Sequence, residues 1–208
     1  RSTVKSAPNA CAPNVVSSQF SLNIHPAPIA LAGGSTTVCV TANAPVTGAT
    51  ATYGTINWTY NGGGSLTNQT ALGPIYHPVG SDIGNPITLT LTVTSTNSCA
   101  PQTASAVYTV NIDPLPVAFA GGSSTICANG SGTVSGAFAA NGTVNWTGDG
   151  LGPISDPTTA TPTYFPSVNE AGNIVTLTME VLSNNTCIPA TSLATYSFII
   201  DGVPSIQN

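Results

Sequence analysis

The stretch Gly142-Thr-Val-Asn-Trp-Thr-Gly-Asp-Gly150 decides the fold, because Gly54-Thr-Ile-Asn-Trp-Thr-Tyr-Asn-Gly62 repeats it 88 positions earlier. Each copy contains one of the two tryptophans of the chain, Trp58 and Trp146. An isoleucine or valine lies two positions before each tryptophan, which places both apolar side chains on one face of a β-strand. The glycines that follow predict a turn. The pattern predicts a small β domain that is built twice around a buried tryptophan.

The repeat extends over nearly the whole chain of 208 residues. A shift of 88 positions aligns residues 26–113 with residues 114–201 without a gap, and 39 of the 88 aligned positions are identical. Such self-similarity at a fixed period is typical of tandem domains. We therefore expect one domain over residues 26–113 and a second over residues 114–208.

Residues 1–25 match the end of a repeat. Phe20 and Ile24 fall on Tyr108 and Ile112, and Cys11 falls on Cys99. This match predicts that residues 1–25 are the C-terminal strand segment of a preceding repeat. The alternative is a donor strand that completes the sandwich of a neighbouring subunit.

The secondary structure expected within a repeat is a series of short strands separated by turns. Asn141-Gly142 predicts a two-residue hairpin turn, and Val134, Ala137 and Phe138 are expected to face the core. Six or seven antiparallel strands in about 88 residues predict an all-β fold, namely tandem immunoglobulin-like Greek-key β-sandwiches. In the second repeat the expected strands are Val117–Ala120, Gly132–Ala140, Gly142–Gly148, Thr161–Pro166, Ile174–Val181 and Thr191–Asp201.

The near absence of charge excludes several function classes. Only 4% of the residues are charged, against about a quarter in a typical soluble protein. The two basic residues, Arg1 and Lys5, both precede the repeats. Binding of nucleic acid or of an anionic membrane surface requires cationic side chains, so neither is expected. No segment has the length of a membrane span, and no direct membrane insertion is expected.

The cysteines indicate an oxidising compartment. Cys39 and Cys99 lie 60 positions apart, as do Cys127 and Cys187. Four cysteines permit three pairings, and the repeat favours the one within each domain, Cys39–Cys99 and Cys127–Cys187. Cys11 then remains unpaired or bonds to another repeat. Such disulfides are typical of extracytoplasmic proteins.

The repeat comparison favours packing roles over chemical ones. His25 and His77 align with Asp113 and Phe165, so no histidine recurs, and we expect no catalytic site and no cofactor. Metal ligands should likewise recur; a calcium site at Asp149 and Asp156 is disfavoured because the first repeat has asparagines there. The recurring aromatic residues are expected in the cores: Trp58, Trp146, Tyr76, Tyr164, Tyr108 and Tyr196.

The junctions between repeats are rich in proline. Pro26 and Pro28 recur as Pro114 and Pro116, and proline fixes the backbone in an extended path. No Gly/Ser-rich spacer intervenes. The junctions therefore predict a stiff end-to-end rod.

The second repeat resembles PKD domains. Asn145-Trp146-Thr-Gly148-Asp149-Gly150, then Tyr164-Phe-Pro166, Gly172 and Val175-Thr-Leu-Thr178, follow the W-x-x-G-D-G … TY … G … V-T-L-T pattern of that family. PKD domains are immunoglobulin-like sandwiches found in surface proteins. The whole repeat is similar to the tandem repeats of giant Bacteroidota cell-surface adhesins, the gliding adhesin SprB among them. The first repeat has Tyr60-Asn61-Gly62 instead, so no role is carried over for the acidic residue.

The resemblance implies an extracellular location at the cell surface and a part in adhesion or gliding motility. Together with the repeats it predicts a non-enzymatic structural segment of a surface adhesin, a rod of disulfide-bonded domains. Its partners would be neighbouring repeats or filament subunits. The alternatives are a filament subunit that polymerises through residues 1–25 and a carbohydrate-binding module that contacts surface glycans.

Overall fold

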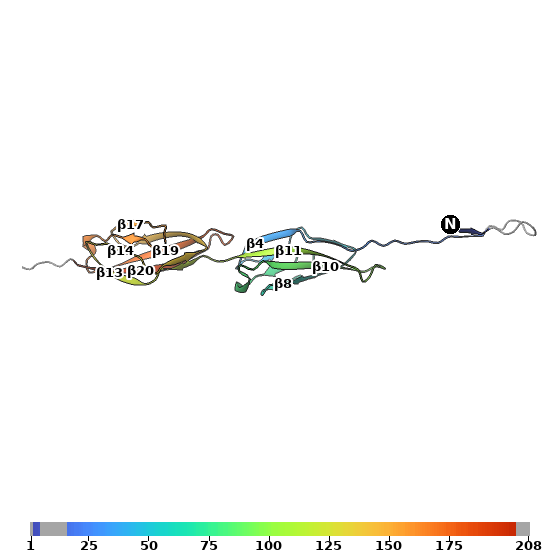
Figure 1. Cartoon of the computed structure of the whole chain (residues 1–208), viewed down its shortest axis with the longest axis horizontal. Coiled ribbons are helices and arrows are strands. Elements are labelled where there is room, and N and C mark those ends of the chain that lie inside the picture. The colour runs from blue at the N-terminus through green and yellow to red at the C-terminus, as the bar shows by residue number, and fades with distance from the viewer. Residues whose placement is uncertain (1, 5–15, 203–208) are drawn as a thin grey trace, which may run out of the picture.

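The chain forms two β-sandwiches placed end to end (Figure 1). The structure is a computed structural model that describes residues 2–4 and 16–202. The first domain contains β3 to β11 and the 3₁₀ turn η1, and the second contains β12 to β20 and η2. Two short strands precede the first domain, β1 (Ser2–Val4) and β2 (Val16–Ser18). The elements of the first domain are β3 (Ile29–Leu31), β4 (Gly34–Cys39), β5 (Ala44–Pro45), β6 (Thr50–Thr52), β7 (Gly54–Tyr60), β8 (Ser65–Thr67), β9 (Ile75–His77), η1 (Gly80–Asp82), β10 (Ile87–Ser95) and β11 (Thr103–Asp113).

The second domain repeats this order element by element. Its elements are β12 (Val117–Phe119), β13 (Ser123–Cys127), β14 (Gly132–Thr133), β15 (Phe138–Ala140), β16 (Gly142–Gly148), β17 (Ile154–Ser155), β18 (Thr163–Tyr164), η2 (Val168–Glu170), β19 (Ile174–Ser183) and β20 (Thr191–Asp201). The fold class predicted from the sequence, tandem immunoglobulin-like β-sandwiches, is confirmed.

Each domain has one four-stranded sheet, in the order β4-β11-β10-β7 in the first and β13-β20-β19-β16 in the second. The facing layer consists of two short sheets, β3-β6 with β5-β9-β8, and β12-β15 with β14-β18-β17. Pairing in the four-stranded sheets is antiparallel except at one edge. There β4 runs parallel to β11, and β13 runs parallel to β20. At this edge the C-terminal end of β4 lies beside the C-terminal end of β11, and the C-terminal end of β13 lies beside that of β20.

Alternation along β19 explains how the sheet faces its core. Val175, Leu177, Met179 and Val181 are buried, and the residues between them face outward. Period-two alternation places every second side chain on the same face of a strand. In the register of β16 with β19, Trp146 lies opposite Met179, so the tryptophan of this edge strand packs into the core beside the central strand β19.

Two separate cores result, one in each domain. The six recurring aromatic side chains belong to them: Trp58, Tyr76 and Tyr108 in the first and Trp146, Tyr164 and Tyr196 in the second, and none is more than 3% exposed. Their aligned positions therefore contribute equivalent parts of each core.

Two local predictions in the second repeat are wrong. Asn141 bends the chain with a positive φ of 59°, but β15 pairs with β12 whereas β16 pairs with β19. The bend therefore crosses between the two layers and is not a hairpin. The expected strand Gly132–Ala140 is interrupted by Gly136, whose φ is +73°. Phe138 lies beyond this interruption and is 54% exposed, whereas Val134 before it is buried.

The described residues before β3 form an extended arm. β1 pairs with β2 in antiparallel register, and the chain continues from there to the first domain without another strand (Figure 1). Phe20 and Ile24 are 88% and 85% exposed, although their aligned residues Tyr108 and Ile112 are buried. In this structure these two side chains therefore contribute nothing to either core.

Candidate functional site at the domain junction

A disulfide joins the two domains. It links Cys39 at the end of β4 to Cys187 in the second domain, 148 positions later, with 4.7 Å between the Cα atoms. The predicted pairing within each repeat is therefore wrong. Among the described cysteines, Cys99 and Cys127 have free thiols, and Cys11 lies outside the described residues.

The strand geometry explains why Cys39 does not pair with Cys99. Cys39 lies beside Asp113, the last residue of β11, because β4 and β11 are parallel. Cys99 lies between β10 and β11, before the start of β11. The 11 residues of β11 span about 36 Å at about 3.3 Å per residue. A disulfide requires Cα atoms within about 7 Å of each other, so the two cysteines of one repeat lie at opposite ends of their domain.

We use the term late loop for residues 96–102 of the first domain and residues 184–190 of the second. The late loop of the second domain holds the linker between the domains. The Asn185 side chain donates from Nδ2 to the carbonyl oxygen of Pro114 at 2.9 Å and accepts at Oδ1 from the N–H of Cys187 at 2.8 Å. The Asp113 carboxylate accepts hydrogen bonds from the N–H and hydroxyl of Thr186 at 3.0 and 2.8 Å. Cys187 Sγ lies 3.6 Å from the Asp113 carbonyl oxygen. These contacts fix the direction in which the second domain follows the first.

The late loop of the first domain repeats the asparagine and cysteine contacts with the residues before its own domain. Asn97 Nδ2 donates to the Pro26 carbonyl oxygen at 3.1 Å, and Asn97 Oδ1 accepts from the Cys99 N–H at 2.8 Å. The Cys99 thiol lies 3.4 Å from the His25 carbonyl oxygen. The contacts of this asparagine and cysteine are therefore shared by both repeats, whereas the Thr186–Asp113 hydrogen bonds occur only at the junction between the domains.

A second recurring constellation closes the opposite end of each domain, where η1 and η2 lie. The buried Glu170 carboxylate accepts from the Tyr164 hydroxyl at 2.7 Å, from the Leu151 N–H at 2.7 Å and from the Ser167 N–H at 2.6 Å. The Gly152 N–H donates to the Tyr164 hydroxyl oxygen at 3.0 Å. We call this set the tyrosine–carboxylate corner. In the first domain Asp82 and Tyr76 form it with Gly63, Gly64 and Val79.

Burial and hydrogen bonding shift both groups of the corner. Burial alone raises the pKa of the Glu170 carboxyl, but the hydrogen bonds from Leu151, Tyr164 and Ser167 outweigh it and lower the pKa from its ordinary value. Burial raises the pKa of Tyr164 to about 12, and the hydrogen bond to Glu170 adds to this effect. The corner is therefore a neutral tyrosine and a carboxylate whose hydrogen bonds are satisfied, an arrangement suited to stability and not to proton transfer near neutral pH. The sequence by itself did not single out Glu170; its six-residue spacing from a recurring tyrosine is the signal that could have found the corner.

We expect Glu170→Gln to weaken the second domain by about 1 to 3 kcal/mol at pH 7, because an amide nitrogen replaces one acceptor of backbone donors. The carboxyl pKa is lower in the folded state, so its contribution is present above the unfolded value and is lost as the pH falls through the folded value. The variant should therefore lose less stability than the unchanged chain between pH 6 and pH 3. Urea unfolding at both pH values, followed by Trp146 fluorescence in a Trp58→Phe background, measures this difference.

Asp82→Asn is the matched control, since it should change the first domain in the same way and leave the second domain unaltered. An identical acid dependence in Glu170→Gln and the unchanged chain would contradict the assigned role.

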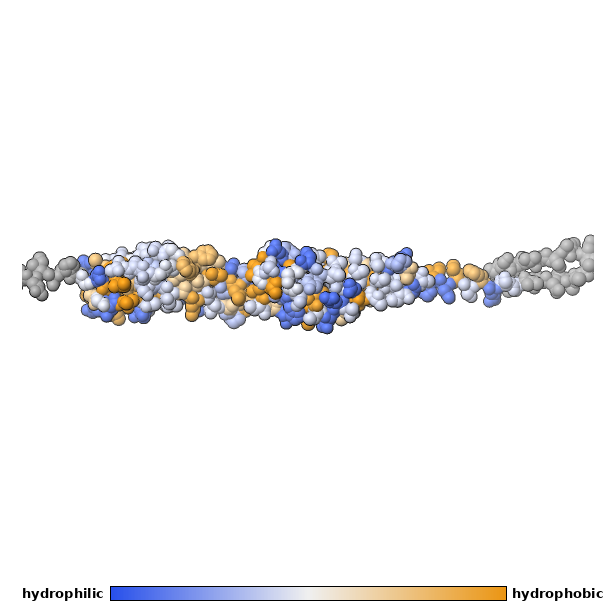
Figure 2. All heavy atoms as spheres, turned by 90° about the horizontal axis from the view of Figure 1, so that it is seen from below, coloured by the Kyte–Doolittle hydropathy of each residue, from blue (hydrophilic) through white to orange (hydrophobic). Residues whose placement is uncertain are grey.

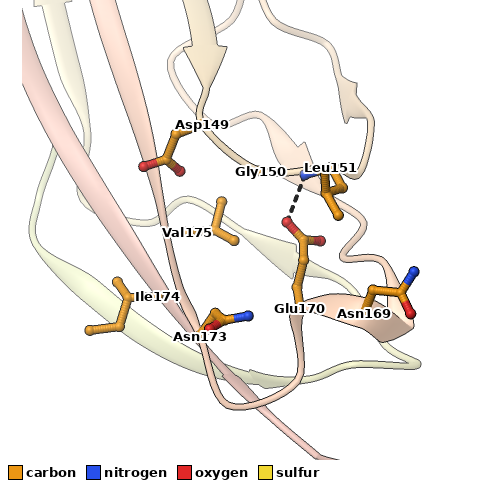
Figure 3. Close-up of a pocket in the computed structure, with 8 residues that line it drawn as sticks. All are labelled: Asp149, Gly150, Leu151, Asn169, Glu170, Asn173, Ile174 and Val175. Atoms are coloured by element: carbon orange, nitrogen blue, oxygen red, sulfur yellow. Dashed lines mark hydrogen bonds between the residues drawn. The ribbon is translucent and has the colours of Figure 1, made fainter.

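A shallow pocket of about 350 Å³ adjoins this corner in the second domain. Figure 3 shows Asp149 and Glu170 on opposite sides of the pocket, with the Glu170 carboxylate directed to the N–H of Leu151. Asp149 accepts from the Thr176 N–H at 2.7 Å, and its counterpart Asn61 accepts from the Thr88 N–H at 2.8 Å. Since an amide serves as well as an acid, Asp149 has a structural role.

The described residues contain no group of three or more His, Cys, Asp or Glu side chains that could hold a metal ion. Asp156 and Asn68, the other acid–amide pair of the sequence comparison, adopt positive φ values of 52° and 58°. Asn and Asp tolerate this conformation best among non-glycine residues, which accounts for their positions. His77 bonds at its ring nitrogens to Thr67 and Asn43 and is not part of the pocket.

Trp146 and Trp58 also hold the long loop that follows their strand. Trp146 donates from Nε1 to the Thr159 carbonyl oxygen at 2.9 Å, and Trp58 donates to the Ala71 carbonyl oxygen at 3.0 Å. The backbone N–H of Trp146 donates to Pro157 at 2.8 Å. A buried indole N–H needs such a partner. The sequence predicted that the tryptophans are buried. It did not predict these hydrogen bonds, because they depend on the path of the loop.

These features define a class of protein: tandem immunoglobulin-like β-sandwiches joined by a structured, covalently closed junction. No protein-family profile matches the sequence, and a comparison with curated proteins found no match. Solved structures do match. An I-band fragment of titin has 12% identity over 86% of this chain and 67% of its own, with a TM-score of 0.52. Human CDH23 EC21–23 has 15% identity over 84% of this chain and 69% of its own, also with a TM-score of 0.52. At these identities the likeness establishes the fold alone. No helix among the described residues is long and apolar enough to cross a membrane.

Proposed function

We propose that the chain is a non-enzymatic structural segment of an extracellular stalk, part of a surface adhesin or filament. The observation that carries this proposal is the junction, where a disulfide and the late-loop hydrogen bonds set one domain on the end of the next. A segment that only tethered two binding domains would not need a structured linker. A disulfide between domains also suits an oxidising, extracytoplasmic setting.

The surface supports the same role. Figure 2 shows pale, nearly neutral residues over most of the visible face, with separate apolar and polar areas. The repeats contain no lysine or arginine, so the domain surfaces offer no cationic site for anionic ligands. Neighbouring repeats are the partners that this surface fits best.

Small-angle X-ray scattering of the full chain tests the stalk. We expect an elongated particle whose maximum dimension stays constant while the disulfide is intact. Reduction should broaden the distribution of dimensions, because the hydrogen bonds of the junction then act alone. A compact particle, or one that is equally flexible before and after reduction, would refute a rigid stalk. Antibodies against the two domains should label intact source cells; labelling only after permeabilisation would refute the surface location.

A second candidate function is assembly by strand donation through the arm. Phe20, Leu22 and Ile24 are spaced two apart and are all more than 70% exposed, as expected for a strand that fills the groove of another copy. Light scattering over a concentration series should then show oligomers that Ile24→Asp abolishes and that Ser21→Asp, on the opposite face, retains. A monomer at every concentration would exclude this candidate.

A further inference from the structure

We propose that Cys127 forms a disulfide with the late-loop cysteine of a following domain of this same type, and that Cys99 forms the corresponding bond with a preceding one. The inference deepens the proposed stalk function and rests on it: each junction of the array would be closed covalently, as the junction in this chain is. Cys99 and Cys127 would then be the two unfilled ends of a continuing series.

The carboxyl-terminal end of the second domain repeats the surface to which the second domain itself is joined. Cys127 lies beside Asp201 in the parallel register of β13 and β20, as Cys39 lies beside Asp113. The Ala128 N–H donates to the Asp201 carbonyl oxygen at 2.9 Å, and the Val40 N–H donates to that of Asp113 at 3.0 Å. A late loop placed on this end would meet Cys127 and the Asp201 carboxylate, the equivalents of Cys39 and Asp113.

The amino-terminal end of the first domain presents the complementary half. Its late loop already has the conformation of the bonded late loop, with Asn97 in the place of Asn185 and the Ser95 hydroxyl in that of Ser183. Cys99 Sγ lies 3.4 Å from the carbonyl oxygen of His25, which precedes the first domain, and Cys187 Sγ lies 3.6 Å from that of Asp113. The contacts of Asn97 and Cys99 therefore form without a disulfide-bonded neighbour. The carboxylate contact that Thr186 makes to Asp113 has no counterpart here, because His25 stands at the aligned position.

Burial separates the joined cysteines from the free ones. Cys39 and Cys187 are each 5% exposed, whereas Cys127 is exposed and Cys99 is half-buried. The aligned positions are otherwise equivalent, so the neighbouring domain accounts for the difference. Cys99 lies beside His25, before the first domain, and Cys127 lies beside Asp201 at the end of the last strand of the second. The two cysteines therefore cannot bond to each other within one folded chain.

The chemistry is an ordinary thiol oxidation. Each thiol loses one proton, a bond forms between the two sulfurs, and a disulfide-bearing oxidant accepts the two electrons and is itself reduced to two thiols. Exposure of Cys127 permits attack on that oxidant, and the late loop then supplies the second thiol at the correct end of the next domain.

The chain in which residues 202–208 are replaced by a second copy of residues 114–201 tests the proposal. We call it the extended chain. In the added copy Cys127→Ser removes a competing thiol, and Thr186→Ser marks the mass of the peptide that contains its late-loop cysteine. After refolding with oxidised and reduced glutathione, free thiols are alkylated, and chymotryptic peptides are mapped by mass spectrometry without reduction. Trypsin is unsuitable because the repeats contain no lysine or arginine.

We expect Cys127 to be linked to the marked peptide and its alkylation to be lost. Cys127 of the unextended chain should be fully alkylated when refolding is dilute enough to prevent bonds between chains. Cys127→Ser in the body of the extended chain should leave the marked cysteine alkylated. Alkylated Cys127 in an extended chain whose third tryptophan reports a folded domain would overturn the proposal, as would a bond between Cys99 and Cys11. If Cys127 is alkylated but small-angle scattering still shows an elongated particle, the disulfide proposal is refuted and the stalk function is not.

Discussion

Loss of the Cys39–Cys187 disulfide is expected to destabilise both domains, each by about 4 kcal/mol on the loop-entropy account. Cys187 lies against Asp113, and Asp113 is 74 positions from Cys187 and 74 from Cys39. When the first domain unfolds alone, the bond still ties Cys39 to the end of its last strand and closes a loop of about that length. When the second domain unfolds alone, the bond ties Cys187 to the start of that domain in the same way. One disulfide therefore restrains the unfolded state of either domain.

Cys39→Ser and Cys187→Ser should reveal this effect, measured by hydrogen exchange of peptic peptides from each domain in increasing urea. Both domains should exchange at lower urea in either variant. Cys127→Ser and Cys99→Ser are the matched controls, since they alter aligned cysteines that have no bond within the described part of the chain. A shift confined to one domain would show that the bond does not act through the junction. An equal shift in Cys99→Ser would instead support a bond between Cys39 and Cys99 within the first repeat.

The sequence predicted the long strands and the cores because both depend on local alternation, but it did not predict β13. In β19 every second residue from Val175 to Val181 is buried, and in β20 Tyr196, Phe198 and Ile200 are, as the period of two requires. The disulfide could not be predicted in this way. A strict repeat is equally consistent with a bond to a cysteine 60 positions later and with one 148 positions later, since both preserve the period. The deciding fact is the parallel pairing of β4 with β11, which no local pattern encodes.

The other errors share this cause. Phe138 was expected inside because alternation was extended through Gly136, where a positive φ resets the face of the strand. Asn141-Gly142 has the composition of a hairpin turn, but a residue with positive φ can equally turn the chain from one layer to the other. Gly142 is required there because a Cβ atom would collide with the carbonyl oxygen of Leu182 on β19. In each case the local backbone state was predictable and its partner strand was not.

The tyrosine–carboxylate corner shows how a repeat comparison can hide a site. Asp82 and Glu170 differ in length and so counted as a mismatch between the repeats, yet both carboxylates accept from the tyrosine six positions earlier. Gly62 and Gly150 are identical because a Cβ atom at either position would collide with that tyrosine hydroxyl. The glycine after Asp149 therefore has a packing reason that is independent of any ligand.

Trp146→Ala is expected to cost the second domain about 3 to 5 kcal/mol, the range for removing a large buried aromatic side chain. The loss has two parts: the indole packs in the core opposite Met179, and its Nε1–H holds the loop through Thr159. Trp146→Phe should cost less, because it keeps most of the ring volume and removes only the hydrogen bond and part of the packing. Hydrogen exchange of residues 149–162 should rise in both variants at urea concentrations where the sheet remains protected.

The repeated stretch supplies its own control for this prediction. Trp58→Ala should produce the same loss in the first domain, because Trp58 occupies the same register opposite Leu91 and bonds to Ala71. Each substitution should leave the core of the other domain protected while the Cys39–Cys187 bond is intact, since the two cores share no residue. A cost of about 0.5 kcal/mol or less, the range of an ordinary surface change, would mean that the tryptophan does not organise the sandwich. Collapse of both domains together would mean that the junction transmits unfolding, and the stalk would then be one cooperative unit instead of a series of separately stable ones.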